Sequence, residues 1–77
     1  MADLKDSLNF IINSIVPEGT KVSITETQED GMTVFEIESP SEVTGRIIGK
    51  EGKTIKSIRN ILNIAFPQTR FLLKIKD

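Results

Sequence analysis

The sequence predicts an α+β domain of two layers, in which three helices cover one face of a three-stranded mixed sheet. Apolar residues recur at helical spacing in three segments, and apolar and polar residues alternate in three shorter ones. Glycine and proline separate these segments, which follow the order αββααβ. A chain of 77 residues is long enough for one domain, and we expect residues 1–77 to form it.

The first helix is predicted over residues 3–15. Its apolar residues share one stripe, and Asp3 is suited to the N-terminus of a helix. Pro17 and Gly19 end it. Phe10 lies off the stripe and is expected either at the flank of the core or in solvent. The stripe consists of Leu4, Leu8, Ile11, Ile12 and Ile15.

An antiparallel hairpin is predicted next. Residues 21–27 and 32–39 both alternate, and Glu29-Asp30-Gly31 between them is typical of a turn. One face of the hairpin is apolar and should pack against the helices. The other is polar and is expected to contact water. The apolar residues are Val22, Ile24, Phe35 and Ile37, and the polar ones are Ser23, Thr25, Glu36 and Glu38.

Two helices and a last strand complete the chain. A short helix opens around Ser39-Pro40 and ends at Gly49, and a longer helix runs from Gly52 or Lys53 to Pro67. Residues 71–76 alternate again. The helix pair is long enough to return this strand parallel to the second strand by a right-handed crossover. The predicted apolar residues are Val43, Ile47 and Ile48, then Ile55, Ile58, Leu62, Ala65 and Phe66, then Phe71, Leu73 and Ile75.

The segment from Gly45 to Ile55 is the candidate functional site. Gly49 and Gly52 flank Lys50 and Glu51, so the backbone can take positive φ angles and approach another segment closely. The amide groups at the start of the following helix favour an anion. With lysines alongside, this pattern predicts a place that holds a phosphate chain, although a plain helix–turn–helix corner is the simpler alternative.

A nucleotide-binding P-loop is excluded. Gly52-Lys53-Thr54 has the ending of that motif, but the glycine that the motif needs five residues earlier is replaced by Ile47. The chain is also too short for the parallel sheet that carries such a loop.

Composition excludes most catalytic chemistry. Cysteine and histidine are absent, which rules out disulfides and thiolate catalysis and removes the usual zinc ligands. The acidic residues fit the hairpin's wet face and turn, so we expect no hydrolase, no metal and no cofactor. No apolar run approaches the roughly 20 residues of a membrane span, and no signal peptide is visible. We therefore expect a cytoplasmic protein.

Charge is distributed unevenly along the chain. The net charge is −1, but residues 46–59 hold five bases and one acid, and the remaining residues hold five bases and ten acids. A basic face on an acidic body directs a polyanion to one surface. Ordinary solvated helix charges are the alternative.

The segment Ile47-Ile48-Gly49-Lys50-Glu51-Gly52 between two helices resembles the GXXG signature of KH domains. The order αββααβ is similar to that of the type II variant, and the size resembles the KhpA-type small bacterial RNA-binding proteins. The resemblance implies that single-stranded RNA lies across the glycine turn, with Lys50 as the main phosphate contact. It implies an RNA-binding set of Gly45, Arg46, Ile47, Ile48, Gly49, Lys50, Glu51, Gly52, Lys53, Thr54, Ile55 and Arg59.

Bases are then expected along an aliphatic groove beside the short helix. Val43, Ile47, Ile48 and Ile55, with Ile37 from the second strand, are the candidates for its wall, although apolar residues at helical spacing usually pack inside. No aromatic residue lies near the turn, so stacking is mostly missing and affinity should be modest and salt-dependent. Glu51 lowers the local positive charge.

A second surface is predicted on the helix that follows the turn. Ile64 lies opposite the apolar stripe and Ile61 on its flank, and with Ser57 and Asn60 they form a strip that the monomer does not bury. KhpA-type proteins are associated with self-pairing and with a larger KH-containing partner. The resemblance thus implies a homodimer or heterodimer through this strip. Two functions follow: an RNA-binding module, such as an RNA chaperone or post-transcriptional regulator, or an adaptor that binds RNA weakly.

Overall fold

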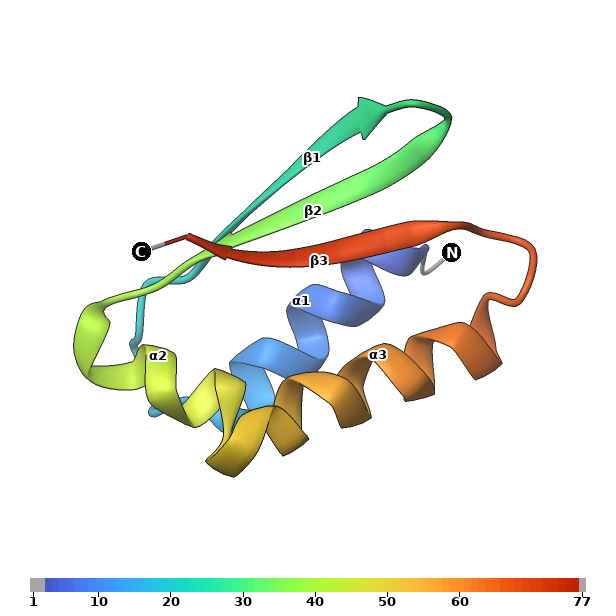
Figure 1. Ribbon diagram of the computed structural model, residues 1–77. Coiled ribbons are helices and arrows are strands. Elements are labelled where there is room, and N and C mark those ends of the chain that lie inside the picture. Colours follow the sequence, from blue (N-terminus) through green and yellow to red (C-terminus); the bar gives the residue numbers. More distant parts are fainter. Residues whose placement is uncertain (1–2, 77) are drawn as a thin grey trace.

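The structure is a computed structural model that describes residues 3–76, and it has two layers (Figure 1). A three-stranded sheet forms one layer, and three helices cover one of its faces. This arrangement confirms the predicted fold class and the order αββααβ. The elements are α1 (Leu4–Ile15), β1 (Ser23–Glu29), β2 (Met32–Glu38), α2 (Ser41–Ile48), a 3₁₀ turn η1 (Lys50–Gly52), α3 (Lys53–Ala65) and β3 (Phe71–Lys76).

Helix α1 begins and ends where its sequence predicts. The Oδ1 atom of Asp3 accepts a hydrogen bond from the amide of Asp6 at 2.8 Å, which satisfies one of the free amides of the first turn. The backbone becomes extended at Val16, directly before Pro17. Leu4, Leu8 and Ile12 of the predicted stripe are buried, Ile11 and Ile15 are partly buried, and Phe10 is 74% exposed.

The strands pair in the order β1-β2-β3, so β2 is central. β1 runs antiparallel to β2, and the two-residue turn between them has positive φ at both Asp30 and Gly31, as tight hairpins require. β3 runs parallel to β2, with Thr33 opposite Phe71 and Glu38 opposite Lys76. Both pairings confirm the sequence prediction.

The core lies between the sheet and the helices. Its largest fully buried side chains come from α1, β2, α2 and α3: Leu8, Ile12, Phe35, Ile37, Ile47 and Leu62. The ring of Phe71 in β3 meets the ring of Phe35 edge to face, with centroids 6.5 Å apart. Each element therefore contributes apolar residues to one core, which holds α2 and α3 at a fixed place beneath the sheet.

One buried residue was not predicted, and one prediction about burial was wrong. Val34 points to the outer face of the sheet, opposite Thr27 and Leu72, yet it is only 5% exposed. It is on the central strand, where neighbours on both sides cover it. Ala65 was expected in the core but is exposed at the last turn of α3. Its short side chain borders the space between α3 and α1.

Candidate nucleic-acid interface

The corner between α2 and α3 has an unusual backbone. Helix α2 ends at Ile48, and φ is positive at Gly49 (79°), Glu51 (57°) and Gly52 (73°). A simple helix ending needs one such residue. The corner therefore holds a more specific conformation than a plain helix–turn–helix reversal.

The two glycines are needed for different reasons. A Cβ atom on Gly49 would lie 2.6 Å from the Cβ and 2.7 Å from the backbone nitrogen of Thr54, closer than atoms can approach. A Cβ on Gly52 would meet nothing within 4 Å. Gly49 thus permits close contact between the corner and the first turn of α3, whereas Gly52 provides only a left-handed backbone.

Three amide groups of this corner are bonded within it. The amide of Gly49 donates to the carbonyl of Gly45 at 2.8 Å, the amide of Gly52 donates to the carbonyl of Gly49 at 3.1 Å, and the amide of Lys53 donates to the carbonyl of Lys50. Gly52 precedes α3 and offers no side chain to cap the amides of its first turn. The other amides of that first turn and the helix dipole favour an anion at the start of α3.

Cations surround the corner and continue along α3. Arg46, Lys50, Lys53, Lys56 and Arg59 are all exposed. The ion pairs found within residues 3–76 are both elsewhere, on the outer face of the sheet: Lys74 with Glu29 and Lys76 with Glu38, each at 3.9 Å. The charges near the corner are therefore not neutralised by carboxylates of the described chain.

A hollow of about 400 Å³ lies between the start of α2 and the end of β3. A Cβ added to Gly45 would meet nothing within 4 Å, so the helix backbone is open there. The hollow is lined by Ser39, Ser41, Thr44, Gly45 and Lys76. Of these, the sequence prediction included only Gly45. The parallel register is what brings Lys76 opposite Glu38, and hence beside the start of α2.

Three candidates for the wall of the expected aliphatic groove have buried side chains. Val43 is 8% exposed, and Ile47 and Ile37 are fully buried, so their side chains belong to the core. Helix α2 turns its apolar side inward and presents serine, threonine and glycine outward. Ile48 and Ile55 remain partly exposed. The RNA contacts assigned to the residues from Gly45 to Arg59 stay a prediction.

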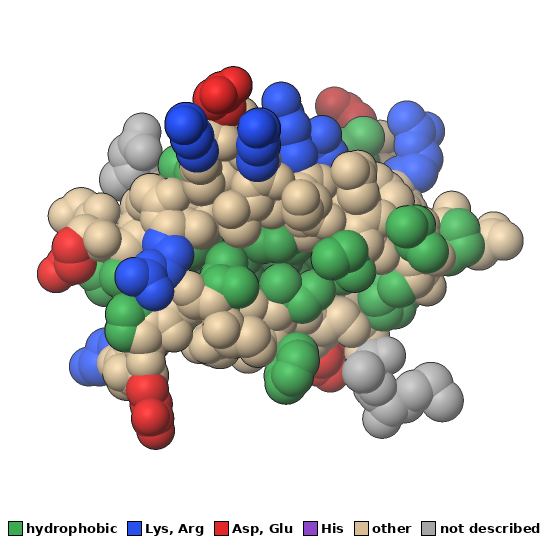
Figure 2. Space-filling model, turned by 90° about the horizontal axis from the view of Figure 1, so that it is seen from below, with side chains coloured by type: hydrophobic (Ala, Val, Ile, Leu, Met, Phe, Trp, Pro, Cys, Tyr) green, Lys and Arg blue, Asp and Glu red, His purple; other side chains and the backbone are tan. Residues whose placement is uncertain are grey.

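A separate apolar surface lies on the helical face of the molecule. Ile64 is 81% exposed, Ile61 54% and Phe10 74%. A groove of about 440 Å³ between α1 and α3 is lined by Asp6, Ser7, Phe10, Ile11, Ile61, Leu62 and Ala65. Figure 2 shows hydrophobic side chains in a band across this face, with Lys and Arg side chains along one edge.

The structure modifies the predicted second surface. Ile61 lines the groove, Ile64 is exposed beside it, and the exposed residues Ser57 and Asn60 are not part of its lining. Phe10 and Ala65 were missed as members of this surface. The off-stripe position of Phe10 was the available signal, but the approach of α1 to α3 is a tertiary feature.

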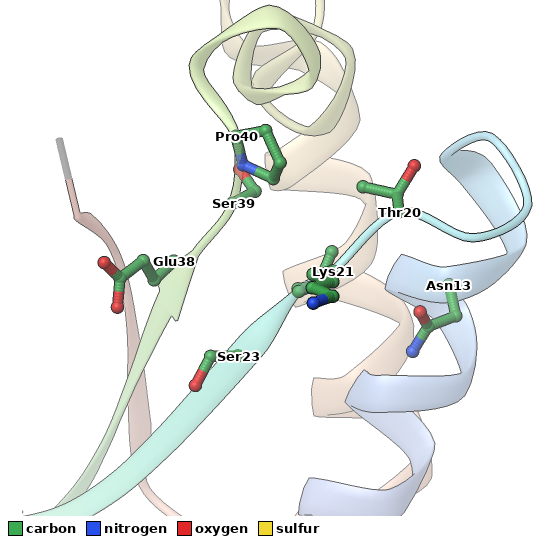
Figure 3. A pocket seen from close by; sticks show the side chains of 8 residues that line it. Asn13, Thr20, Lys21, Ser23, Glu38, Ser39 and Pro40 are labelled. Atoms are coloured by element: carbon green, nitrogen blue, oxygen red, sulfur yellow. The ribbon is translucent and has the colours of Figure 1, made fainter.

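A further hollow, of about 560 Å³, lies where α1, β1 and the start of α2 meet (Figure 3). Lys21 and Glu38 both line it, but the carboxylate of Glu38 is paired with Lys76. Small polar side chains, including Asn13, Ser23 and Ser39, make up much of the rest. Within residues 3–76, Lys21 and Glu38 form no ion pair with each other.

Within residues 3–76, no group of acidic residues is placed to hold a metal ion. None of the helices described is both long and apolar enough to cross a membrane.

The αββααβ order, the mixed sheet and the glycine corner between α2 and α3 define a type II KH domain. A family model described as "KhpA/KhpB, KH domain" matches residues 5–76. The chain belongs to this family.

Relatives in bacteria support the assignment. The chain is 41% identical over 59 residues to the RNA-binding protein KhpA of Chlamydia caviae, covering 77% of this chain and 76% of that protein. It is 38% identical over 60 residues to KhpA of Thermotoga maritima, covering 78% and 80%. With KhpA of Treponema pallidum the identity is 27% over 75 residues, covering 95% and 94%. No solved structure gives a significant match.

Proposed function

We propose that this chain is a non-catalytic protein that binds single-stranded RNA and holds its backbone at the glycine corner. The observation that carries the proposal is the corner itself, where exposed cations surround uncapped helix amides. The relatives' name, RNA-binding protein KhpA, supports the same class of ligand. The cellular role that we propose is that of an RNA chaperone or post-transcriptional regulator in the cytoplasm.

The proposed path of the RNA follows the described contacts. Phosphates lie against the corner and the start of α3, with Lys50, Arg46 and Lys53 as their counter-charges. The strand continues past the open backbone of Gly45 into the polar hollow that Lys76 borders. This hollow offers hydroxyl groups and no aromatic ring, so bases are held without the roughly 1–3 kcal/mol that stacking on an aromatic ring adds.

The decisive test removes the charge at the corner. The double variant Lys50→Asp, Glu51→Asp should lose binding to short single-stranded RNA, measured by fluorescence anisotropy at low ionic strength. Asp tolerates the left-handed backbone at position 51, so the fold should persist, as judged by circular dichroism. The slope of log K against log salt for the wild type reports the number of phosphates neutralised, at about 0.7 each for a single strand.

A matched control separates local contact from net charge. Lys5→Asp changes the charge equally on the exposed side of α1, away from the corner. It should leave RNA binding nearly unchanged. The proposal fails if the wild type shows no salt-sensitive RNA binding, or if both variants weaken binding alike.

A second candidate function, assembly with another KH protein, is favoured by the apolar surface between α1 and α3. Phe10, Ile61 and Ile64 are exposed side by side with a groove whose lining is mainly apolar. We propose a second copy of this chain as the occupant, because a projecting isoleucine next to a groove can form a self-complementary contact across a two-fold axis. A larger KH-containing protein would use the same surface.

The oligomeric state tests this second candidate. Size exclusion with light scattering should give a dimer for the wild type and a monomer for Ile64→Glu. Asn63→Glu, an exposed position on the same helix but outside the apolar surface, should remain dimeric. A wild-type monomer would remove the proposal, and so would a dimer that both variants retain.

A further inference from the structure

The outer edge of β1 carries backbone groups that the sheet does not use. A two-residue turn closes on a hydrogen-bonded pair, here Glu29 and Met32, and such pairs alternate along an antiparallel ladder. The amide and carbonyl groups of Ile24, Glu26 and Gln28 therefore point away from β2. Within residues 3–76, no hydrogen bond from a loop or a side chain uses the backbone of these three residues. This edge is therefore open to another strand.

Strand β1 lacks the features that usually protect an edge strand. Its seven residues, Ser23–Glu29, include no proline and no lysine, and its register with β2 runs without a bulge. Every residue of β1 except Ile24 is exposed, so no other described element covers the strand. Threonine and isoleucine also favour strand structure. The composition of β1 thus suits it to pair on both of its edges.

The charges along β1 fit this edge to a second copy of itself. When two β1 strands pair antiparallel with Thr25 opposite Thr25, Lys21 lies opposite the partner's Glu29. Lys21 is exposed and forms no ion pair within residues 3–76. The Oε2 atom of Glu29 lies 3.9 Å from the Nζ atom of Lys74, so the paired strands would hold a Lys–Glu–Lys row on the outer face.

Neighbouring registers of the same two strands are less favourable. The unpaired groups alternate along β1, so the register can change only in steps that keep Ile24, Glu26 and Gln28 facing the partner strand. One such step places Glu26 opposite the partner's Glu26, and like charges in that position are destabilising. The step in the other direction places Lys21 opposite a threonine and loses both ion pairs. The charges therefore select the register centred on Thr25.

We propose that β1 pairs antiparallel with β1 of a second copy about a two-fold axis at Thr25, which joins two three-stranded sheets into one. This contact is separate from the apolar surface between α1 and α3. It does not rest on RNA binding, because no residue from Gly45 to Arg59 belongs to β1. The two copies of Glu26 are diagonal neighbours and repel each other, so the contact is weak and forms at high protein concentration.

Single cysteines test the register, because the chain has no cysteine of its own. In the Thr25→Cys variant the two substituted residues face each other in a non-hydrogen-bonded pair, with Cα atoms about 4.5 Å apart, within reach of a disulfide. In the matched Thr27→Cys variant the two substituted residues are about 14 Å apart, because four residues separate them along the strand. Both variants also carry Ile64→Glu, which removes the apolar contact.

The cross-linking is performed in glutathione redox buffer at millimolar protein and measured by non-reducing gel electrophoresis. Thr25→Cys should form on the order of tenfold more covalent dimer than Thr27→Cys, whose sulfur atoms are out of reach. A mixture of Ser23→Cys and Thr27→Cys should form the mixed dimer, because the register places these two positions in one pair. Equal yields from Thr25→Cys and Thr27→Cys overturn the proposal, and so does a mixed dimer of these two that exceeds the Thr25→Cys dimer.

A proline substitution tests the contact without cross-linking. Glu26→Pro removes an amide that points away from β2, so the fold should persist, as judged by circular dichroism. In the Ile64→Glu background it should abolish the dimer that light scattering detects at millimolar protein, and a dimer that persists contradicts the proposal. If Glu26→Pro misfolds, Lys21→Glu replaces it. That variant should weaken the dimer, and Lys21→Glu, Glu29→Lys should restore it; a dimer insensitive to both also contradicts the pairing.

Discussion

Gly49 and Gly52 differ in what they contribute to the same corner. Gly49 has φ 79° and ψ 170°, a region that glycine alone occupies readily, and it lies against Thr54. Gly52 has φ 73° and ψ 15°, which asparagine also adopts, and it has open space around it. The two positions should therefore respond differently to substitution, although the GXXG pattern treats them as equivalent.

Gly49→Ala should destabilise the protein by about 1–3 kcal/mol from the backbone conformation alone, and displacement of Thr54 adds to that. Gly52→Ala should cost about 1 kcal/mol and Gly52→Asn less. Urea denaturation measures all three. A Gly52→Asn variant that is as unstable as Gly49→Ala would contradict this distinction between the two glycines.

At the scale of elements, the sequence predicts every helix and strand because each carries its own local signal. Asp3 marks the start of α1, Asp30-Gly31 marks the hairpin, and Pro67 follows the end of α3. What the sequence does not predict depends on contacts between elements. Val34 is buried by its strand neighbours, and Lys76 reaches the hollow beside α2 through the parallel register of β3.

The candidate site also has one part that the sequence predicts and another that depends on contacts between elements. The glycine corner and its cations are contiguous in the chain, so the sequence locates them. For the candidate wall of the groove, periodicity shows that Ile47 and Val43 share a face but not that this face is buried in the core. Phe10 is part of the apolar surface because α1 lies beside α3 in the folded chain, which the sequence alone does not show.

Helix α1 offers a test of local stabilisation that does not involve the site. Asp3→Ala removes the acceptor for the amide of Asp6 and should lower the free energy of unfolding by about 1 kcal/mol. Asp3→Ser should restore most of that loss, because serine caps helices nearly as well. Thermal or urea denaturation gives both values, and RNA binding should be unaffected. A loss that serine does not restore would point to the charge of Asp3 instead of its hydrogen bond.

At the scale of the whole molecule, the acidic residues of the hairpin and the cations of α3 occupy different parts of a structure that measures 33 × 28 × 21 Å. Glu26 and Asp30 belong to the hairpin and are exposed. The Debye length is about 10 Å at 0.1 M salt and about 30 Å at 0.01 M. The field of the hairpin should therefore reach the corner only in dilute buffer.

The variant Glu26→Gln, Asp30→Asn should bind RNA as wild type does at about 0.15 M salt and more tightly, by a few-fold, at about 0.01 M. Asparagine suits the positive φ of position 30, so the hairpin turn is kept. Anisotropy titrations at the two salt concentrations measure the difference. An equal gain at both concentrations would mean that these acids lie close to the bound strand.

The contact between Gly49 and Thr54 also affects the rate at which a ligand can bind. Because the missing Cβ lets the corner rest directly on the first turn of α3, the amides there have their direction set when the chain folds. A single strand then binds to a preorganised site, and the conformational entropy lost on association comes almost entirely from the strand. Recognition at this corner should resemble a rigid docking event, with nearly superimposable free and occupied forms of the protein.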